Sequence, residues 1–358
     1  MMALHTPFRR AHRAAICSAV ALGFGGVAPV SAMSFAEAFD AAQSFDAQYR
    51  AAGYEREAAQ LNVPIARSTL LPQVSFNYSN STVEGTREFP NGLNQPVAVR
   101  VDYTAPQASL VLRAPIFNYE AINRFREAQA SARGADQVFR AEGLELLNRL
   151  GTAYVQLLLS EEALSLNEQQ VKAFELQAAR AEQRFRRGEG TRTDIAIAQA
   201  TLDVSRVRVI EAADGLEVAR RDLRRIIGQD VPALNRIPGD FTPAPLPQTR
   251  LEDWLSIAFR QSPMLRAREE AIEAARFQIE RARAGHLPKL DLVGSLSDSR
   301  NESLSSLNQG SRLRSIGVQL TVPIFSGFGI QAGVDLAGVN RSRAQEALRA
   351  EQIGRAHV

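Results

Sequence analysis

The chain has 358 residues, with 42 Lys and Arg against 39 Asp and Glu, and its formal net charge is +3 at pH 7. Three of the arginines and the single Cys lie within residues 1–32, so residues 33–358 carry 39 basic side chains (42 − 3), 39 acidic ones and no cysteine. For residues 33–358 this excludes a basic nucleic-acid-binding surface, disulfide bonds and a thiol site.

Residues 1–32 have the three parts of a secretory signal peptide. A basic start with three arginines precedes the uncharged apolar run Ala14–Val30, and Val30-Ser31-Ala32 supplies the small residues of a cleavage site. A transmembrane anchor is the competing interpretation, but about 17 apolar residues with several Gly are at the lower limit for crossing a bilayer. A lipoprotein anchor needs a Cys at the cleavage point, whereas Cys17 lies inside the apolar run. We therefore predict that the signal peptide is cleaved.

The next feature along the chain is an internal repeat, which begins with a helical segment. Residues 35–68 are rich in Ala, Glu, Gln and Arg, which are strong helix formers, and we expect one helix there. The Leu-Pro pair that follows favours an extended backbone. The whole segment recurs at an offset of 216 residues, and a second match recurs at an offset of 208. The matched pairs include Phe35–Phe39 with Leu251–Leu255, Leu71-Pro72 with Leu287-Pro288, and Ala114–Asn118 with Val322–Ser326.

After each Leu-Pro pair, apolar and polar residues alternate with period two, which predicts two strands per repeat. The connections between paired strands, Ser79–Pro96 and Ser297–Gly310, are rich in Ser, Asn, Gly and Pro and predict loops. A half-buried sheet of a soluble protein is one interpretation of such strands. A barrel with lipid outside and water inside is the other.

Two observations favour the barrel: the predicted signal peptide and the long helices described next. After Ala32 there is also no uninterrupted apolar stretch of about 18 residues, so any membrane contact made there requires strands. The side chains expected to face lipid are Val74, Phe76, Tyr78, Leu290, Leu292, Val318 and Leu320.

Residues 119–227 contain no Pro and predict a long helical hairpin. Its first arm, residues 119–187, would be roughly 100 Å long at 1.5 Å per residue. Core positions recur every seven residues in both arms, which is the pattern of a coiled coil. The predicted rows are Leu150, Leu157, Leu164, Val171, Ala178 and Phe185, then Ile195, Leu202, Val209, Leu216 and Leu223, then Ala198, Ser205, Ala212, Ala219 and Ile226.

The turn between the arms lies at residues 185–194. Gly188 or Gly190 would end the first helix with a positive φ, and Thr191 or Thr193 would cap the second. This Gly-x-Gly is not a phosphate-binding loop, because it follows a helix rather than a strand and no Gly-Lys-Ser/Thr comes after it.

The sequence offers no catalytic, metal-binding or cofactor-binding constellation. Its four His are His5, His12, His286 and His357, and they are too scattered for a metal cluster or a catalytic pair. The acidic residues lie among Arg on helical segments, a pattern of i,i+4 pairs rather than of paired catalytic carboxylates. We therefore expect neither an enzyme nor a cofactor.

The turn and the order of the motifs around it resemble the TolC family of outer-membrane efflux and secretion channels. The resemblance rests on the Arg-x-Gly turn with the Ala/Gln-rich helix Asp194–Ala200, on Leu-Pro before each first strand, and on the Pro-Ile-Phe that ends each second strand. It covers about Phe35 to Ala350. It implies a mixed α and membrane-β fold, in which each protomer gives long coiled-coil hairpins and four strands to a trimeric outer-membrane β-barrel with a periplasmic α-helical tunnel.

The resemblance also implies a function and partners. The protein would be the passive exit duct of a tripartite efflux pump or a type I secretion system, located in the outer membrane with its helices in the periplasm. Its partners would be two further copies, a periplasmic adaptor (membrane fusion protein), an inner-membrane ABC or RND-type transporter, and outer-membrane lipid. The adaptor-docking tip would consist of Arg187, Gly188, Glu189, Gly190, Thr191 and Asp194. The alternative function is that of a periplasmic coiled-coil adaptor, although adaptors do not have the duplicated unit.

The second repeat is shorter than the first. A second unit as long as the first would continue for about 90–100 residues beyond Val358, so we expect a second hairpin outside this sequence and assign no gate residues. A trimer of residues 33–358 alone would then not form a sealed tunnel. The predicted division is a signal peptide (1–32), a first repeat (33–240, with the hairpin 119–227), an incomplete second repeat (241–350) and a doubtful terminus (351–358).

Overall fold

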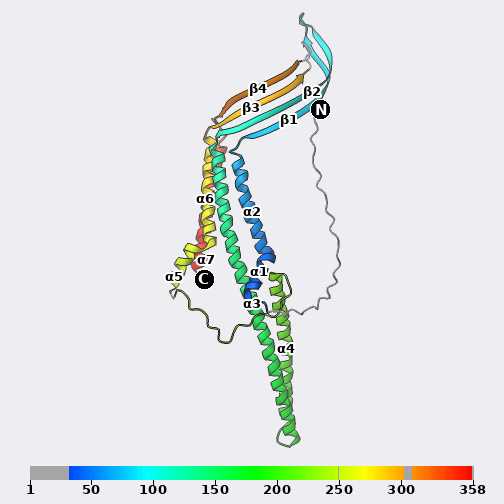
Figure 1. The fold of residues 1–358 in the computed structure, drawn as a ribbon, viewed down its shortest axis with the longest axis vertical. Coiled ribbons are helices and arrows are strands. Elements are labelled where there is room, and N and C mark those ends of the chain that lie inside the picture. Colours follow the sequence, from blue (N-terminus) through cyan, green and yellow to red (C-terminus); the bar gives the residue numbers. More distant parts are fainter. Residues whose placement is uncertain (1–31, 249, 302–308, 357–358) are drawn as a thin grey trace, which may run out of the picture.

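The computed structural model describes residues 32–248, 250–301 and 309–356, so the predicted signal peptide lies, except for Ala32, outside the described part. A four-stranded antiparallel sheet stands at one end of the molecule, the helices run away from it, and the α3–α4 turn lies at the far end (Figure 1). The elements in chain order are α1 (Phe35–Phe45), α2 (Ala47–Ser68), β1 (Gln73–Pro90), β2 (Pro96–Phe117), α3 (Tyr119–Arg186), α4 (Arg192–Ile227), α5 (Leu251–Gln261), α6 (Pro263–Arg283), η1 (Ala284–His286), β3 (Lys289–Asn301), β4 (Gln309–Thr321) and α7 (Gly329–Ala356).

The helix expected over residues 35–68 is broken at Asp46. This residue ends α1 with φ −55° and ψ 118°, and its carboxylate accepts a hydrogen bond from the backbone N–H of Tyr49 at 2.8 Å, which caps α2. The guanidinium of Arg149, on α3, donates to both carboxylate oxygens at 3.2 Å. The prediction of one helix was wrong because a cap and an ion pair to a neighbouring helix stabilise the break.

The same break recurs 216 residues later, at Ser262. Its backbone has φ −61° and ψ 118°, and its hydroxyl accepts from the N–H of Leu265 at 3.4 Å, which caps α6. Pro263 is the first residue of α6, where a missing N–H breaks no helical hydrogen bond. The sequence repeat is thus also a repeat of local structure, while the division of the chain at residue 240 remains a prediction.

The sheet has the order β1-β2-β3-β4, and each strand is antiparallel to its neighbours. β1 pairs with β2 along its whole length, from Gln73 opposite Arg113 to Pro90 opposite Pro96. The loop predicted at Ser79–Pro96 is therefore mostly strand, with its turn at residues 91–95. This prediction was wrong because polar residues of low strand propensity still pair when the partner strand holds them in register.

The second strand pair is shorter. β3 and β4 pair from Lys289 opposite Thr321 to Asn301 opposite Gln309, so the loop predicted at Ser297–Gly310 begins later than expected. The Pro-Ile-Phe motif closes β2, as predicted, but its counterpart at residues 323–325 lies beyond the end of β4.

The predicted long hairpin is present as α3 and α4. α3 is one helix of 68 residues, about 100 Å long at 1.5 Å per residue, and the 36 residues of α4 pack against it. The heptad seam is confirmed along most of the hairpin, because Leu150 and Leu157 are fully buried in α3 and all buried side chains of α4 except Ile227 lie on the predicted rows. Those of α4 on the rows are Ala198, Leu202, Ser205, Ala219, Leu223 and Ile226. At the turn the prediction was wrong for Phe185, which is 38% exposed because the seam ends there.

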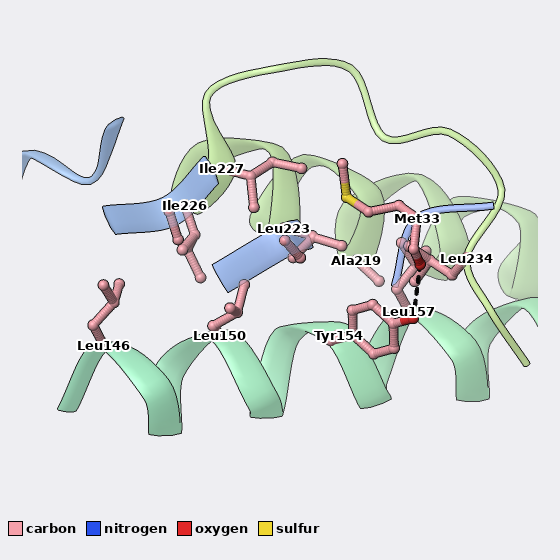
Figure 2. Close-up of a cluster of buried hydrophobic side chains, with 12 residues drawn as sticks. Met33, Leu146, Leu150, Tyr154, Leu157, Ala219, Leu223, Ile226, Ile227 and Leu234 are labelled. Carbon is pink, nitrogen blue, oxygen red and sulfur yellow. Dashed lines mark hydrogen bonds between the residues drawn. The ribbon is translucent and has the colours of Figure 1, made fainter. Parts of the chain in front are cut away.

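The main hydrophobic core lies where α1, α3, α4 and the segment after α4 meet (Figure 2). Met33 enters this core from the N-terminal side and forms a parallel bridge with Leu234. The Tyr154 hydroxyl donates to the Met33 carbonyl at 3.0 Å, so no polar group of this buried tyrosine is left unpaired. The core therefore holds the start of the described chain and the connector between the repeats against the hairpin.

The remaining helices form a layer beside α3. α2 packs on one side of α3, α6 packs on the other, and α7 packs on α6 (Figure 1). Among the described residues, no helix combines the length and the hydropathy needed to cross a membrane.

Candidate functional site

The strand register gives the sheet two chemically different faces. Residues directly opposite one another in antiparallel strands point to the same face. Val74 lies opposite Leu112, Leu112 opposite Gly294, and Gly294 opposite Ile316, so one apolar face crosses all four strands. This face holds all seven residues predicted to contact lipid: Val74, Phe76, Tyr78, Leu290, Leu292, Val318 and Leu320.

The apolar face is open to its surroundings. The five of these seven side chains on β1 and β4 are between 61% and 67% exposed, while the two on β3 are half-buried. Large aliphatic and aromatic side chains gathered on one open face mark a surface that another apolar phase or protein covers.

The opposite face is mostly polar and carries few charges. Arg113 Nη2 donates to Asp291 Oδ2 at 2.6 Å, and the Asp291 side chain is only 5% exposed. The remaining polar side chains on this face are hydroxyls and amides, apart from Lys289, which reaches a helix. They are Gln73, Ser75, Asn77 and Ser79 of β1, Gln107 and Ser109 of β2, Ser295, Ser297 and Ser299 of β3, and Ser311, Ser315, Gln319 and Thr321 of β4.

The structure brings the six predicted tip residues together in the α3–α4 turn. Gly188 has φ +78°, a conformation that favours glycine, and its N–H donates to the Phe185 carbonyl at 2.9 Å. Thr191 and Asp194 form a capping box, in which the Thr191 hydroxyl accepts from the Asp194 N–H at 3.2 Å. In return, the Asp194 carboxylate accepts from the Thr191 N–H at 2.8 Å.

These contacts divide the tip into two groups of residues. The hydrogen bond from the backbone N–H of Thr191 lowers the pKa of Asp194 most, and the one from the Thr191 hydroxyl lowers it further. This carboxylate is therefore already occupied in capping the start of α4. Gly190 is half-buried against the end of α3. Arg187 and Glu189 are exposed and have no ion pair among the described residues, so they are free to contact another molecule.

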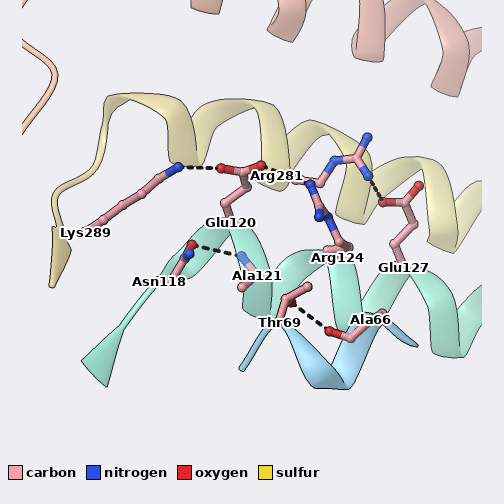
Figure 3. Close-up of polar contacts among 9 residues, drawn as sticks. All are labelled: Ala66, Thr69, Asn118, Glu120, Ala121, Arg124, Glu127, Arg281 and Lys289. Carbon is pink, nitrogen blue, oxygen red and sulfur yellow. Dashed lines mark hydrogen bonds and ion pairs between the residues drawn. The ribbon is translucent and has the colours of Figure 1, made fainter. Parts of the chain in front are cut away.

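A group of ion pairs joins the sheet to the helices (Figure 3). Lys289 lies at the start of β3, and its Nζ is 2.7 Å from Oε2 of Glu120, which lies at the start of α3. Nη2 of Arg124 is 3.4 Å from the other oxygen of the same carboxylate. Two turns beyond Glu120, Arg281 of α6 contacts Glu127 of α3 at 2.8 Å. The hydrogen bond from Lys289 is the main cause that lowers the pKa of Glu120 below its ordinary value.

Sequence reasoning missed this junction. Its partners are more than 150 residues apart, and nothing in the local pattern around Glu120 or Glu127 identifies Lys289 or Arg281 as a partner. The break at Asp46 could have been found, because Asp46 and Ser262 are both favoured helix N-caps at matching positions of the repeat.

In the part of the chain that the structure describes, no group of three or more His, Cys, Asp or Glu side chains is placed to hold a metal ion. What the described residues do offer is a two-faced sheet, a long helical hairpin and an exposed turn.

Two relatives named for protein secretion match most of this chain. The protease secretion protein PrtF of Dickeya chrysanthemi is 33% identical over 343 residues, covering 94% of this chain and 73% of PrtF. The alkaline protease secretion protein AprF of Pseudomonas aeruginosa is 32% identical over 300 residues, covering 83% of this chain and 62% of AprF.

Further matches are to channel proteins. The outer membrane protein TolC of Escherichia coli is 26% identical, covering 92% of this chain and 67% of TolC. Among solved structures, CusC aligns with a TM-score of 0.75 at 18% identity, over 89% of this chain and 72% of CusC. This chain therefore has the fold of such channels and spans between 62% and 73% of the length of these relatives.

The sequence profile of outer membrane efflux proteins matches residues 40–229 and 254–356. The family and the outer-membrane location expected from the sequence are confirmed by these matches, which support a channel protein and give no support to the adaptor alternative. The family is one of channels rather than of enzymes. The chain belongs to the outer membrane efflux protein family.

Proposed function

We propose that this chain is the outer-membrane exit duct of a protein secretion system and conducts its substrate passively from an inner-membrane transporter. The observation that carries this proposal is the two-faced sheet joined directly to the helix α3, about 100 Å long. The names of PrtF and AprF favour secreted protein as the substrate class over drugs or metal ions.

The sheet is one third of a barrel in this proposal. β1 and β4 are the outer strands of the protomer's sheet, and each has an edge without a partner strand among the described residues. Open edges are closed in membrane barrels, because lipid offers no hydrogen-bond partner to the backbone. Three copies in a ring pair each β1 with the next copy's β4 and give twelve strands.

The barrel wall then has lipid on one side and water on the other. The apolar face, with Phe76 and Val318, faces lipid, and the face with its serines, glutamines and the Arg113–Asp291 pair lines the lumen. Arg314 lies opposite Leu296 on this face, and the next pair along, Asp298 and Arg312, forms an ion pair at 2.9 Å, so these charges mark the limit of the apolar face.

The α3–α4 turn is the docking tip for a periplasmic adaptor in this proposal. Gly188, Thr191 and Asp194 shape the turn, while Arg187 and Glu189 present exposed charges to the partner. The energy for transport comes from the inner-membrane transporter, and this chain performs no chemical step.

Deletion of the gene from the cells that encode it, followed by complementation, tests the proposal. We expect the deletion to remove specific proteins from the culture medium and complementation to restore them. We also expect the chain to stay in the outer-membrane fraction after a carbonate wash. Unchanged secretion, or release of the chain by carbonate, would contradict the proposal.

The docking tip has its own test, since charge reversal at Arg187 should weaken adaptor binding without unfolding the hairpin. Arg187→Glu is expected to reduce secretion at least tenfold while the amount of protein in the outer membrane stays constant. Lys172→Glu is the matched control, because it makes the same charge change on an exposed site of α3, about 20 Å from the turn. Equal secretion by the two variants would rule out a docking role for Arg187.

A further inference from the structure

The junction between the two repeats within the chain is a template for a second junction. Within the chain, β2 of the first repeat pairs with β3 of the second, and α3 packs on α6. In the sequence repeat, β4 matches β2 at an offset of 208 residues, and β1 matches β3 at an offset of 216. The outer edges of β4 and β1, which have no partner strand among the described residues, are thus the counterparts of two edges that do pair (Figure 1).

This template predicts the register in which β4 of one copy pairs with β1 of the next. Leu112 lies opposite Gly294 in the internal junction, and the two offsets convert this pair into Leu320 opposite Tyr78 of the next copy. The same conversion brings apolar side chains together on one face and polar ones together on the other. The further pairs are Val322 with Phe76 on the apolar face, and Gln319 with Ser79 and Thr321 with Asn77 on the polar face. Both faces of the sheet therefore continue from one copy to the next.

One residue beyond the template, this register brings opposite charges together. The internal pairing ends at Gln107, and the next residue of β2 is Pro106, which has no N–H to offer a neighbouring strand. The counterpart of Pro106 in β4 is Arg314, which keeps its N–H, so the pairing between copies can extend to it. The residue opposite Arg314 is then Glu84 of the next copy.

Neither of these charged side chains is satisfied within its own chain. Arg314 and Glu84 are both exposed, and neither side chain has an ion pair or a hydrogen bond within the described part of the chain. Glu84 also lies directly opposite Asp102 of β2, and like charges in directly opposed positions of antiparallel strands are destabilising. One open edge strand thus carries a cation without an ion pair, and the other carries one of two facing carboxylates.

The helices below these strands expose apolar side chains at the positions that the template brings into contact. Glu120 of α3 and Arg281 of α6 form ion pairs at the internal junction, and their counterparts are Phe328 and Ile65. Phe328, just before α7, is 78% exposed, and Ile65 of α2 is 63% exposed. Phe328 also has φ +62°, a conformation that is unfavourable for a bulky residue. Contact between copies would remove both side chains from water.

We infer that β4 and α7 of one copy pack on β1 and α2 of the next in the geometry of the internal junction, and that Arg314 forms an ion pair with Glu84 of the next copy. The inference rests on the proposed function, because the strand pairing between copies belongs to the barrel proposed there. It adds the register of that pairing and the charged contact that fixes it. The occupant of each open edge is a second copy of this chain.

The ion pair selects one register from those that the two faces allow. A shift by two residues keeps every side chain on its face, because side chains alternate with period two. Such a shift would place Arg314 opposite Thr82 or Thr86 instead of a carboxylate. The other arginine of the edge strand, Arg312, is already paired with Asp298 in its own chain.

Cysteine cross-linking tests the register, in a background where Cys17, the single native cysteine, is replaced by Ser. Leu320→Cys combined with Tyr78→Cys places thiols of neighbouring copies directly opposite each other. We expect this protein to form disulfide-linked dimers and trimers in the outer membrane with a membrane-permeant oxidant. Leu320→Cys combined with Val74→Cys is the matched control, since Val74 lies on the same face of β1, about 13 Å along the strand from Tyr78. We expect at least fivefold less linked protein from the control.

The outcomes separate the inference from the proposed function. A protein that is not trimeric in detergent, or not in the outer membrane, contradicts the proposed function. An intact outer-membrane trimer in which the Tyr78→Cys pair cross-links no better than the Val74→Cys pair overturns the inference alone.

A charge exchange tests the ion pair itself. Arg314→Glu and Glu84→Arg each place like charges at the junction, and each should lower at least threefold the fraction of trimer that survives heating in detergent. The double variant, with both changes, should restore this fraction to the native level. Arg300→Glu is the control, because Arg300 is exposed on the same face but lies on the inner strand β3. It should leave the fraction unchanged. A double variant that is no more stable than the single ones would overturn the ion pair.

Discussion

At the residue scale, Asp46 and Ser262 perform the same task with different chemistry. Both end a short helix and cap the next one, but Asp46 also binds Arg149 on α3. Asp46→Ala removes a cap and leaves a largely buried guanidinium without its partner, so we expect a loss of about 2–4 kcal/mol in the free energy of unfolding. Ser262→Ala removes only a hydroxyl cap and should lower the free energy of unfolding by about 1 kcal/mol. Denaturant unfolding of the purified proteins in detergent, followed by circular dichroism, measures both, and equal losses would refute the role given to Arg149.

The same carboxylate gives stability a pH dependence. Burial alone would raise the pKa of Asp46, but the hydrogen bonds from Arg149 and from the N–H of Tyr49 outweigh it, and the net pKa is lowered. Since the folded-state pKa lies below the unfolded value of about 3.9, this stabilisation is fully present above that pH and is lost as pH falls through the folded-state pKa. Asp46→Asn keeps an N-cap without a titrating group. We expect its stability to fall less steeply below pH 4 than that of the native chain, and parallel curves would exclude this assignment.

At the element scale, the α3–α4 seam decides the stability of the hairpin. Leu157 is fully buried, so Leu157→Ala should lower the free energy of unfolding by about 2–5 kcal/mol. Val155, two residues away on the same helix, is 45% exposed, and Val155→Ala should change the free energy of unfolding by less than about 1 kcal/mol. Thermal unfolding of the two variants side by side checks this. Similar melting temperatures would mean that the seam does not hold the hairpin together.

The elements also show what a sequence can and cannot predict. The heptad rows of α3 and α4 and the turn at Gly188 were predictable because periodicity and glycine conformation are local properties. The sheet faces were predictable near the helices for the same reason. The strand character of residues 79–90 was not, since it depends on the register with β2. The Glu120–Lys289 pair depends on a fold that brings distant segments together, and local patterns carry no such information.

At the scale of the whole molecule, the orientation of the barrel wall is open to a direct test. Val318 lies on the apolar face of β4, and its neighbour Gln319 lies on the polar face. In a lipid-facing wall, Val318→Arg should lower the free energy of unfolding by about 2–4 kcal/mol and reduce the amount of protein recovered in the outer membrane. The Gln319→Arg protein should assemble normally, because its new side chain faces water. Quantitative blotting of membrane fractions distinguishes the two variants. Loss of Gln319→Arg with retention of Val318→Arg would mean that the two faces are assigned the wrong way round.

The unbroken course of α3 has a mechanical consequence. One helix runs from the base of the sheet to the α3–α4 turn, so a push at the turn is not absorbed by any hinge within it. A rod about 100 Å long that tilts by about 5° at its fixed end moves its free end by about 9 Å. The fixed end is held by the Glu120–Lys289 and Glu127–Arg281 contacts. At its fulcrum the arm is therefore held by these two ion pairs together with the packing of α2 and α6 against α3, far from the point where force is applied.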